Sequence, residues 1–523
     1  MDKNTSKILI SNYIFTGLED RPIPGAVVIT DNKITAVTTK EEALKLRNPD
    51  TAVYELGDQL ICPGFVDNHV FFTGYVWSHL GADLSGAGSK KEAAEILAEY
   101  AKELPKGKSV FGHGLSEEAA ESEEDMDEAF EGFGDTAVIG FTKGRDGCIM
   151  NQAAREKYGF DEKEVYAEVC WKVFDEYLRE EAFIVREYEK FSDLLAGRGV
   201  TAIKEIGFDR YSGFTELLRR MEKEGALKHR IHLVSQPVGY DMDYSYAKEC
   251  QELFNGEFIQ FMGYNVMVDG EIASNNADVI DEYKNLPGSH GEQEIDYRAL
   301  EEMTVKADAM GLRCALHAEG DGAVKKTIDI YETCRRVNGA RDSRHVITDL
   351  EMVRTEDLKR MAGLGITACN YVQIMDCLGD YEEFYGYDCV GEEGVRNYWP
   401  YQRMFENGVH AVCGTDLPLT VPDIPLSAYL TVNRTFPDGK PEGGINRECA
   451  LTVSQILKAW TKEGQYANFK EKVLGTLEPG KLADIAVIDR NLFEVEAEKL
   501  KEAEVSMTIC DGNIVFQRRE KES

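Results

Sequence analysis

The stretch LRCALHAEGDGAVKKTIDIYETCRRVNGARDSRHVIT, residues 312–348, decides the fold class of this chain. Its first part, residues 312–317, is an apolar run typical of a buried strand, and residues 322–337 carry apolar side chains at helical spacing. A second strand-like run follows at residues 346–348. A strand, a helix and another strand in this order predict one unit of a parallel β/α fold.

The same alternation continues on both sides of this stretch. Further strand-like runs stand at residues 200–206, 232–236, 258–268, 366–370 and 409–413. Windows with helical spacing lie between them, at residues 188–196, 214–223, 297–310 and 355–364. Alternation sustained over this length predicts an α/β fold with a (β/α)8 TIM-like barrel, here over residues 61–471.

The two ends of the chain differ from this middle part. Residues 1–60 and 472–523 read as short strands joined by turns, including an Asp511-Gly512-Asn513 hairpin. An acidic stretch follows the first barrel strand and belongs to an inserted segment at about residues 75–185. We therefore expect two β-rich ends that bracket a barrel with one large insertion.

Composition excludes several classes of function. The 523 residues include 59 Lys+Arg and 94 Asp+Glu, a net charge of −35 that repels nucleic acid and anionic membranes. The twelve cysteines form no CxxC pair, which favours a reduced, cytoplasmic protein. The first residues are polar and no apolar run reaches the length of a membrane span. We expect a small-molecule substrate and neither nucleic acid nor membrane as a partner.

Four side chains near predicted strand ends are candidates for a metal site, because the active site of a parallel barrel lies at the carboxyl ends of its strands. His69 ends the run ICPGFVDNH, His317 ends LRCALH, His345 stands directly before the run VIT, and Asp416 follows AVCGT. Imidazole and carboxylate are the usual ligands of Zn²⁺ and similar ions. Three imidazoles and one carboxylate could therefore converge on one cation.

The order and wording of these motifs resemble the amidohydrolase superfamily, specifically the family 3 group that includes N-substituted formamide deformylases. Four segments carry the resemblance, which covers nearly the whole chain. They are PGFVDNH at residues 63–69, HAEGDGA at 317–323, GTDLP at 414–418 and GTLEPGKLAD at 475–484.

This resemblance implies a barrel flanked by a small β-sandwich domain built from residues 1–60 and 472–523. It also implies a divalent metal, zinc first, whose bound hydroxide attacks an amide or similar C–N bond. The implied ligands are His69, His317, His345 and Asp416, with Asp416 also acting as general base and acid. A homodimer is compatible with the family.

Three positions depart from the family pattern. Phe71 stands where the family has a second first-strand histidine, and Asn265 where it has the lysine that bridges two metals as a carbamate. Cys148 follows Gly147 where a histidine is usual. The first two departures predict one metal per chain. Phe71, Cys148, Asn265 and Asp269, which opens an Asp-Gly turn, are candidates for substrate contacts.

Two further residues, Lys204 and Glu205, close the strand-like run that begins at residue 200. Either side chain could point into the barrel mouth and take a catalytic part. Glu205 could supply a missing oxygen ligand, and Lys204 could be carbamylated in place of the family lysine. A salt-bridge pair without a catalytic part is the alternative.

These observations leave three hypotheses about function. The first is a metal-dependent hydrolase of a small amide, formamide or cyclic amide, with Asp416 as the proton carrier. The second is a non-hydrolytic enzyme of the same fold, an isomerase, lyase or deaminase-like variant with a reduced metal centre. The third is a non-catalytic small-molecule binder, which the presence of His69, His317, His345 and Asp416 argues against.

Overall fold

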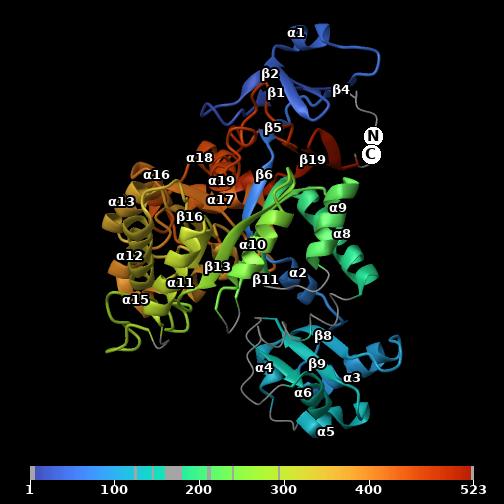
Figure 1. Ribbon diagram of the computed structural model, residues 1–523, viewed down its shortest axis with the longest axis vertical. Coiled ribbons are helices and arrows are strands. Elements are labelled where there is room, and N and C mark those ends of the chain that lie inside the picture. Colours follow the sequence, from blue (N-terminus) through green and yellow to red (C-terminus); the bar gives the residue numbers. More distant parts are fainter. Residues whose placement is uncertain are drawn as a thin grey trace. The chain divides into compact units, whose positions relative to one another are not determined.

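The computed structural model of the chain describes residues 6–122, 126–143, 147–159, 173, 180–208, 214–237, 241–291 and 295–519 (Figure 1). It divides into two compact units. The first comprises Met1–Val70, Ser192–Asp209 and Arg219–Ser523, and the second comprises Phe71–Phe191 and Arg210–Leu218.

The first unit contains the predicted barrel, which is confirmed. Eight parallel strands form one sheet. In chain order they are β6 (Phe65–Val70), β11 (Val200–Phe208), β12 (Arg230–Gln236), β13 (Ile259–Met267), β14 (Arg313–His317), β15 (Val346–Thr348), β16 (Thr367–Asn370) and β17 (His410–Cys413). A parallel bridge between Val70 and Leu417 brings the first and last strands together, so the sheet curls almost into a closed barrel.

Helices follow the strands and cover the outside of the sheet, as Figure 1 shows for α10 to α13. The helices that lie wholly in this unit are α10 (Tyr244–Leu253), α11 (Tyr297–Ala309), α12 (Asp321–Asn338), α13 (Thr355–Leu364), α14 (Ile374–Cys377), α15 (Gly386–Val395), α16 (Tyr401–Glu406), α17 (Ile424–Asn433), α18 (Val453–Trp460) and α19 (Lys462–Ala467). Two further helices, α8 (Glu181–Gly197) and α9 (Phe214–Glu224), have residues in both units.

Helix α12 shows how the opening stretch specifies its own structure. It buries Val324, Ile328 and Tyr331, which lie three or four residues apart and so share one face. Arg335 and Arg336 stand in its last turn, where positive charge is favourable to the helix dipole.

Both chain ends contribute to a second eight-stranded sheet in the first unit. Its strands are β1 (Lys7–Ile14), β2 (Ile23–Thr30), β3 (Lys33–Thr38), β4 (Ala52–Glu55), β5 (Leu60–Pro63), β18 (Ile485–Ile488), β19 (Val505–Cys510) and β20 (Asn513–Gln517), with the short helix α1 (Lys40–Lys45). The ends meet where β5 pairs antiparallel with β18, as Ile61 lies opposite Val487. The Asp511–Gly512 turn joins β19 to β20. The sandwich arrangement expected here stays a prediction.

The second unit has its own four-stranded sheet, in the order β10-β9-β8-β7. The elements are α2 (Phe72–Trp77), β7 (Ala82–Asp83), α3 (Lys90–Ala101), β8 (Val110–Leu115), α4 (Glu117–Ala120), α5 (Met126–Phe130), β9 (Val138–Thr142), β10 (Cys148–Met150) and α6 (Gln152–Tyr158). Leu84, Leu97, Val110 and Val138 lie in its apolar core. The chain thus has a separate core after the first barrel strand, in the region of the expected insertion.

Two observations bear on the setting of the chain. No helix within the described residues is both long enough and apolar enough to cross a bilayer. No disulfide joins the cysteines that the structure describes.

Candidate active site

Two imidazoles and two carboxylates stand at the carboxyl ends of four barrel strands. His69 lies near the end of β6 and His317 is the last residue of β14. Asp349 directly follows β15, and Asp416 follows β17 by three residues. Because parallel strands present their carboxyl ends at one rim, these four side chains share the barrel mouth. We call them the mouth quartet.

His69 and Asp416 are held together by the closure of the barrel. The backbone N–H of Asp416 donates to the carbonyl oxygen of His69 at 2.8 Å, and His69 Nε2 lies 3.7 Å from Asp416 Oδ1. Buried Asp67 fixes this seam, because its carboxylate accepts hydrogen bonds from the backbone N–H and the hydroxyl of Thr415, at 3.0 and 2.5 Å. Asp416 has a φ of +50°, a backbone conformation that residues other than glycine seldom adopt.

His317 and Asp349 form the second pair. His317 Nε2 lies 2.9 Å from Asp349 Oδ2, and Asp349 also has a positive φ, +53°. Burial alone would lower the pKa of His317, but the Asp349 carboxylate, with Asp269 and Asp416 behind it, outweighs burial and raises the pKa to about 9. Without a metal, His317 therefore holds a proton at neutral pH.

The protonation state of the His69 ring differs from that of His317. Burial lowers its pKa well below the usual value, and the positive charges of His317 and Lys204 lower it further. His69 is thus neutral, which is the form of imidazole that binds a metal. Tyr371, directly after β16, packs against it with 5.2 Å between the ring centroids.

The structure does not bring His345 to this rim. His345 precedes β15, and the register of β14 and β15 sets His317 beside Thr348, at the other end of the strand. Four residues of strand separate His345 from Asp349, roughly 13 Å at about 3.3 Å per residue. The prediction that His345 joins His69 and His317 as a ligand is therefore corrected, because His345 stands at the amino end of its strand.

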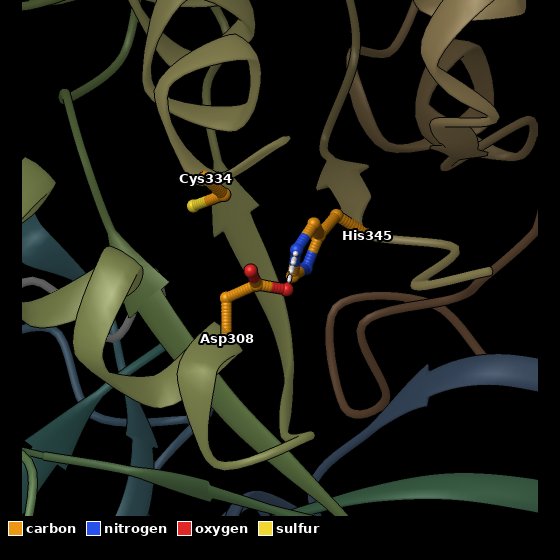
Figure 2. A group of neighbouring side chains, drawn as sticks. All are labelled: Asp308, Cys334 and His345. Atoms are coloured by element: carbon orange, nitrogen blue, oxygen red, sulfur yellow. Dashed lines mark hydrogen bonds and ion pairs between the residues drawn. The ribbon is translucent and has the colours of Figure 1, made fainter. Parts of the chain in front are cut away.

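His345 instead lies in a buried group with Asp308 and Cys334 (Figure 2). One possible ligand atom from each residue lies within 4.8 Å of the others, and within the described residues this is the one His, Cys, Asp or Glu group of that kind. The geometry makes it a possible metal triad by distance. Whether a metal fits there depends on the hydrogen bonds that these three side chains already make.

Both ring nitrogens of His345 are already used. The backbone N–H of Cys314 donates to Nδ1 at 3.1 Å, so the proton of the neutral ring must sit on Nε2, which faces Asp308 Oδ1 at 3.0 Å. Burial lowers the pKa of His345 and keeps the ring neutral. A metal at Nε2 would force the proton onto Nδ1, against the N–H of Cys314.

The other two members of the group are also poorly prepared for a metal. Asp308 accepts hydrogen bonds from Asn338 at 2.8 Å and from Arg341 Nε at 2.7 Å. Burial raises the pKa of the Cys334 thiol to about 12, so the thiolate that a metal needs is not formed at neutral pH. We conclude that this group is a hydrogen-bonded structural cluster.

Two predicted substrate contacts in the first unit have partners of their own. The side-chain amide of Asn265, on β13, donates to Gln236 Oε1 at 2.7 Å. Asp269 accepts the backbone N–H groups of Glu319, Gly320 and Asp278 at 2.9–3.0 Å. Asp269 thus holds the loop after His317 in place, and the Asn265 side-chain amide is tied to Gln236.

The structure also places the four other predicted residues, Phe71, Cys148, Lys204 and Glu205. Phe71 is the N-cap of α2, and Cys148 is the first residue of β10 and half-buried. Both belong to the second unit, so their part in substrate binding stays a prediction. Lys204 and Glu205 lie on β11 and are fully buried. Burial holds the pKa of the Lys204 amine well below its usual value.

Sequence reasoning missed Asp349 and Tyr371. The rule that functional groups follow strands would have found Asp349, since it comes directly after VIT, the same run that His345 precedes. Tyr371 follows a strand in the same way, after residues 366–370.

Comparison with known proteins identifies the family of the chain. The sequence pattern described as "Amidohydrolase family" matches residues 52–516. A putative amidohydrolase, YtcJ, of Bacillus subtilis is 23% identical over 97% of this chain and 98% of its own length. The N-substituted formamide deformylase of Arthrobacter pascens is 22% identical over 94% of this chain and 95% of its own.

A solved structure shows the same fold. The uncharacterized metal-dependent hydrolase of Pyrococcus horikoshii OT3 superposes with a TM-score of 0.77 at 22% identity, over 94% of this chain and 99% of that protein. Family membership supports a hydrolase-type function that depends on a metal. With a pattern match that spans the barrel and the shared end sheet, this chain belongs to the amidohydrolase family.

Proposed function

We propose that this chain hydrolyses a C–N bond of a small molecule, in an amide, a formamide or a cyclic amide. One observation carries the proposal: the mouth quartet gathers two imidazoles and two carboxylates at the rim where barrel enzymes place their chemistry. The formamide deformylase among the relatives supports this class of bond, and neither its substrate nor any other is assigned to this chain.

The mouth quartet fits one divalent metal. The two imidazoles and the Asp416 carboxylate are a donor set that suits Zn²⁺ and similar ions. Nδ1 of His317 is buried and has no hydrogen-bond partner within the described residues, as a nitrogen kept for a metal would. Asn265 is tied to Gln236, so no lysine carbamate stands on β13 to bridge a second ion. His69, His317 and Asp416 would hold one metal, with zinc as our first choice, and Asp349 would stay on Nε2 of His317.

When bound, such a metal lowers the pKa of its water toward about 7 and polarises a carbonyl. The residues of the chain do the rest. The Asp416 side chain is 21% exposed, the highest value in the mouth quartet, so it can take a proton from water and pass it to the leaving nitrogen. Asp349 orients the His317 ring through the 2.9 Å contact. Buried Asp67 keeps His69 and Asp416 in register through Thr415.

A second function is favoured by one specific contact. The ion pair of His317 and Asp349 is complete by itself and could move protons without hydrolysis. An isomerase, lyase or deaminase-like reaction with a reduced metal centre would use this pair. A non-catalytic binder is the weakest proposal, because it leaves the arrangement of four titratable groups without a use.

The test is a turnover assay with controlled metal content. The chain is purified without chelator and offered N-formyl amines, simple amides and cyclic amides, and amine and acid products are measured. We expect hydrolysis that is lost after chelation and restored by Zn²⁺. Release of an isomerised or eliminated product instead of amine and acid would favour the second function and reject the first. Hydrolysis by protein shown to hold no metal would reject the part assigned to the metal. Replacement of exposed Asp50 by Asn serves as the matched control for carboxylate changes at the mouth.

A further inference from the structure

Three buried basic side chains on barrel strands are not part of the mouth quartet and stand outside the chemistry proposed for it. They are Lys204 on β11, His232 on β12 and Arg313 on β14. We propose that these three residues form a buried site for one small, exchangeable inorganic anion of halide size.

The strand pattern places the three side chains in one interior. Side chains alternate along a strand, so Arg313 shares the inward face of β14 with His317, four residues on. The register that sets Ile203 opposite Ile231 continues to Lys204 beside His232. The Lys204 amine also acts electrostatically on His69 and Cys369, which lie on β6 and β16. A group that reaches side chains on strands around the sheet lies within the barrel.

Most polar side-chain atoms of this group are buried and have no hydrogen-bond partner within the described residues. Lys204 is 0%, His232 1% and Arg313 3% exposed. The Lys204 amine, both ring nitrogens of His232, and Nε and Nη2 of Arg313 have no hydrogen-bond partner within the described residues. Arg313 Nη1 donates to the carbonyl oxygen of Ala467. Buried donors of this kind are normally satisfied, so each calls for a partner that the polypeptide does not supply.

Burial keeps the pKa of Lys204 and of His232 well below their usual values, so the positive charge of this group is that of Arg313, which has no ion-pair partner within the described residues. The carboxylate on the neighbouring strand, Asp67, is taken up by Thr415 and the backbone of His69. Lys470 adds positive potential at His232 instead of cancelling it. Arg230, equally buried on β12, shows the usual solution, because Asp484 binds it through Nε at 2.9 Å and Nη2 at 3.0 Å. Arg313 has no such carboxylate within the described residues, and a buried cation without a counter-charge is costly.

These features also limit the charge and the size of the ligand. Several N–H donors and a guanidinium charge select an anion over water or a cation. Full burial inside a sheet of eight strands selects a small ion over phosphate or an organic acid. Chloride and bromide meet both conditions.

Anomalous scattering from bromide locates the ion directly. The full chain is crystallised from sodium gluconate, whose anion is too large to enter, with and without sodium bromide. We expect a bromide peak in contact with Lys204 Nζ and the Arg313 guanidinium. Ordered water alone at this place would overturn the proposal, as would a carbamate formed on Lys204, which mass spectrometry of the intact chain would detect.

A solution measurement gives an independent result. At constant ionic strength, replacing gluconate by chloride should raise the Tm of the native chain saturably, by about 2 °C. Lys204→Met should remove this chloride-dependent rise whatever it does to the Tm itself, and Lys248→Met, a change at an exposed lysine of α10, should keep it. An equal response of the native chain to both salts would reject the site, even if the Lys204 variant fails to fold.

Discussion

The two ends of this barrel carry the same kinds of side chain and differ in what those side chains are free to do. At the carboxyl end, His317 meets Asp349 and its Nδ1 has no hydrogen-bond partner within the described residues. At the amino end, His345 meets Asp308 at nearly the same distance, 3.0 Å, and its Nδ1 accepts a backbone N–H. His317 thus keeps one ring nitrogen for a ligand, whereas both ring nitrogens of His345 already have hydrogen-bond partners.

The comparison shows that proximity of ligand atoms is a poor guide to a metal site. Asp308, Cys334 and His345 satisfy the distance test, whereas no three members of the mouth quartet do. The tautomer that Cys314 imposes on His345, and the guanidinium of Arg341 on Asp308, argue against a metal at the amino end. The following predictions test this contrast, from the largest effect to the smallest.

Asp416→Asn should give the largest change. Loss of the proton carrier at the mouth is expected to lower kcat by about 100- to 10,000-fold, since general acid–base catalysis contributes that much. Thermal unfolding of the metal-free chain should be unchanged, because the Asp416 side chain lies at the rim. Steady-state kinetics measure the effect beside Asp50→Asn, and full activity of the Asp416 variant would remove this residue from the reaction.

The pH dependence of stability should differ between the ends in the metal-free chain. The folded-state pKa of His317 is raised to about 9, above the unfolded value of about 6.5, so its pairing with Asp349 stabilises the fold fully below pH 6.5. That contribution, about 3 kcal/mol at most, is lost as the pH rises through 9. Urea unfolding from pH 6 to 10 measures it.

Asp349→Asn is the control for this pH effect, because the amide keeps the shape and removes the charge. We expect the variant to lose most of the decline in stability between pH 6.5 and 9. A native chain whose unfolding free energy stays level over this range would show that the ion pair does not form.

His345→Asn should act on stability and spare the chemistry. The change removes the acceptor of the Cys314 N–H and the donor to Asp308, and we expect a loss of about 2 kcal/mol in the free energy of unfolding. Metal content and kcat should match those of the native chain at a temperature where both are folded. Calorimetry and turnover together separate this outcome from a catalytic loss.

Much of this arrangement could be predicted from the sequence. Local periodicity predicts the strands and helices, and the rule of strand ends predicts His69, His317 and Asp416 at the mouth. The same rule wrongly predicts His345 at the mouth. Strand β15 has only three residues, so His345 before it and Asp349 after it lie at opposite ends of the barrel although they are close in the sequence. For a strand this short, a site residue can be predicted only if it follows the strand, at its carboxyl end, and does not precede it.

The remaining features depend on contacts between distant parts of the chain. The pairing of Asn265 with Gln236, and of His317 with Asp349, joins residues on different strands through side-chain rotamers that no local pattern specifies. The buried group of Lys204, His232 and Arg313 is equally hidden, since each residue alone reads as an ordinary polar interruption of a strand.

Metal content of three forms of the chain tests the central contrast most directly. The native chain, His317→Asn and His345→Asn are purified in parallel without chelator, and bound metal is counted per folded chain. We expect about one ion in the native chain and in His345→Asn, and little in His317→Asn. Metal retained by His317→Asn and lost by His345→Asn would place the ion at the amino end and contradict the assignment of the active site.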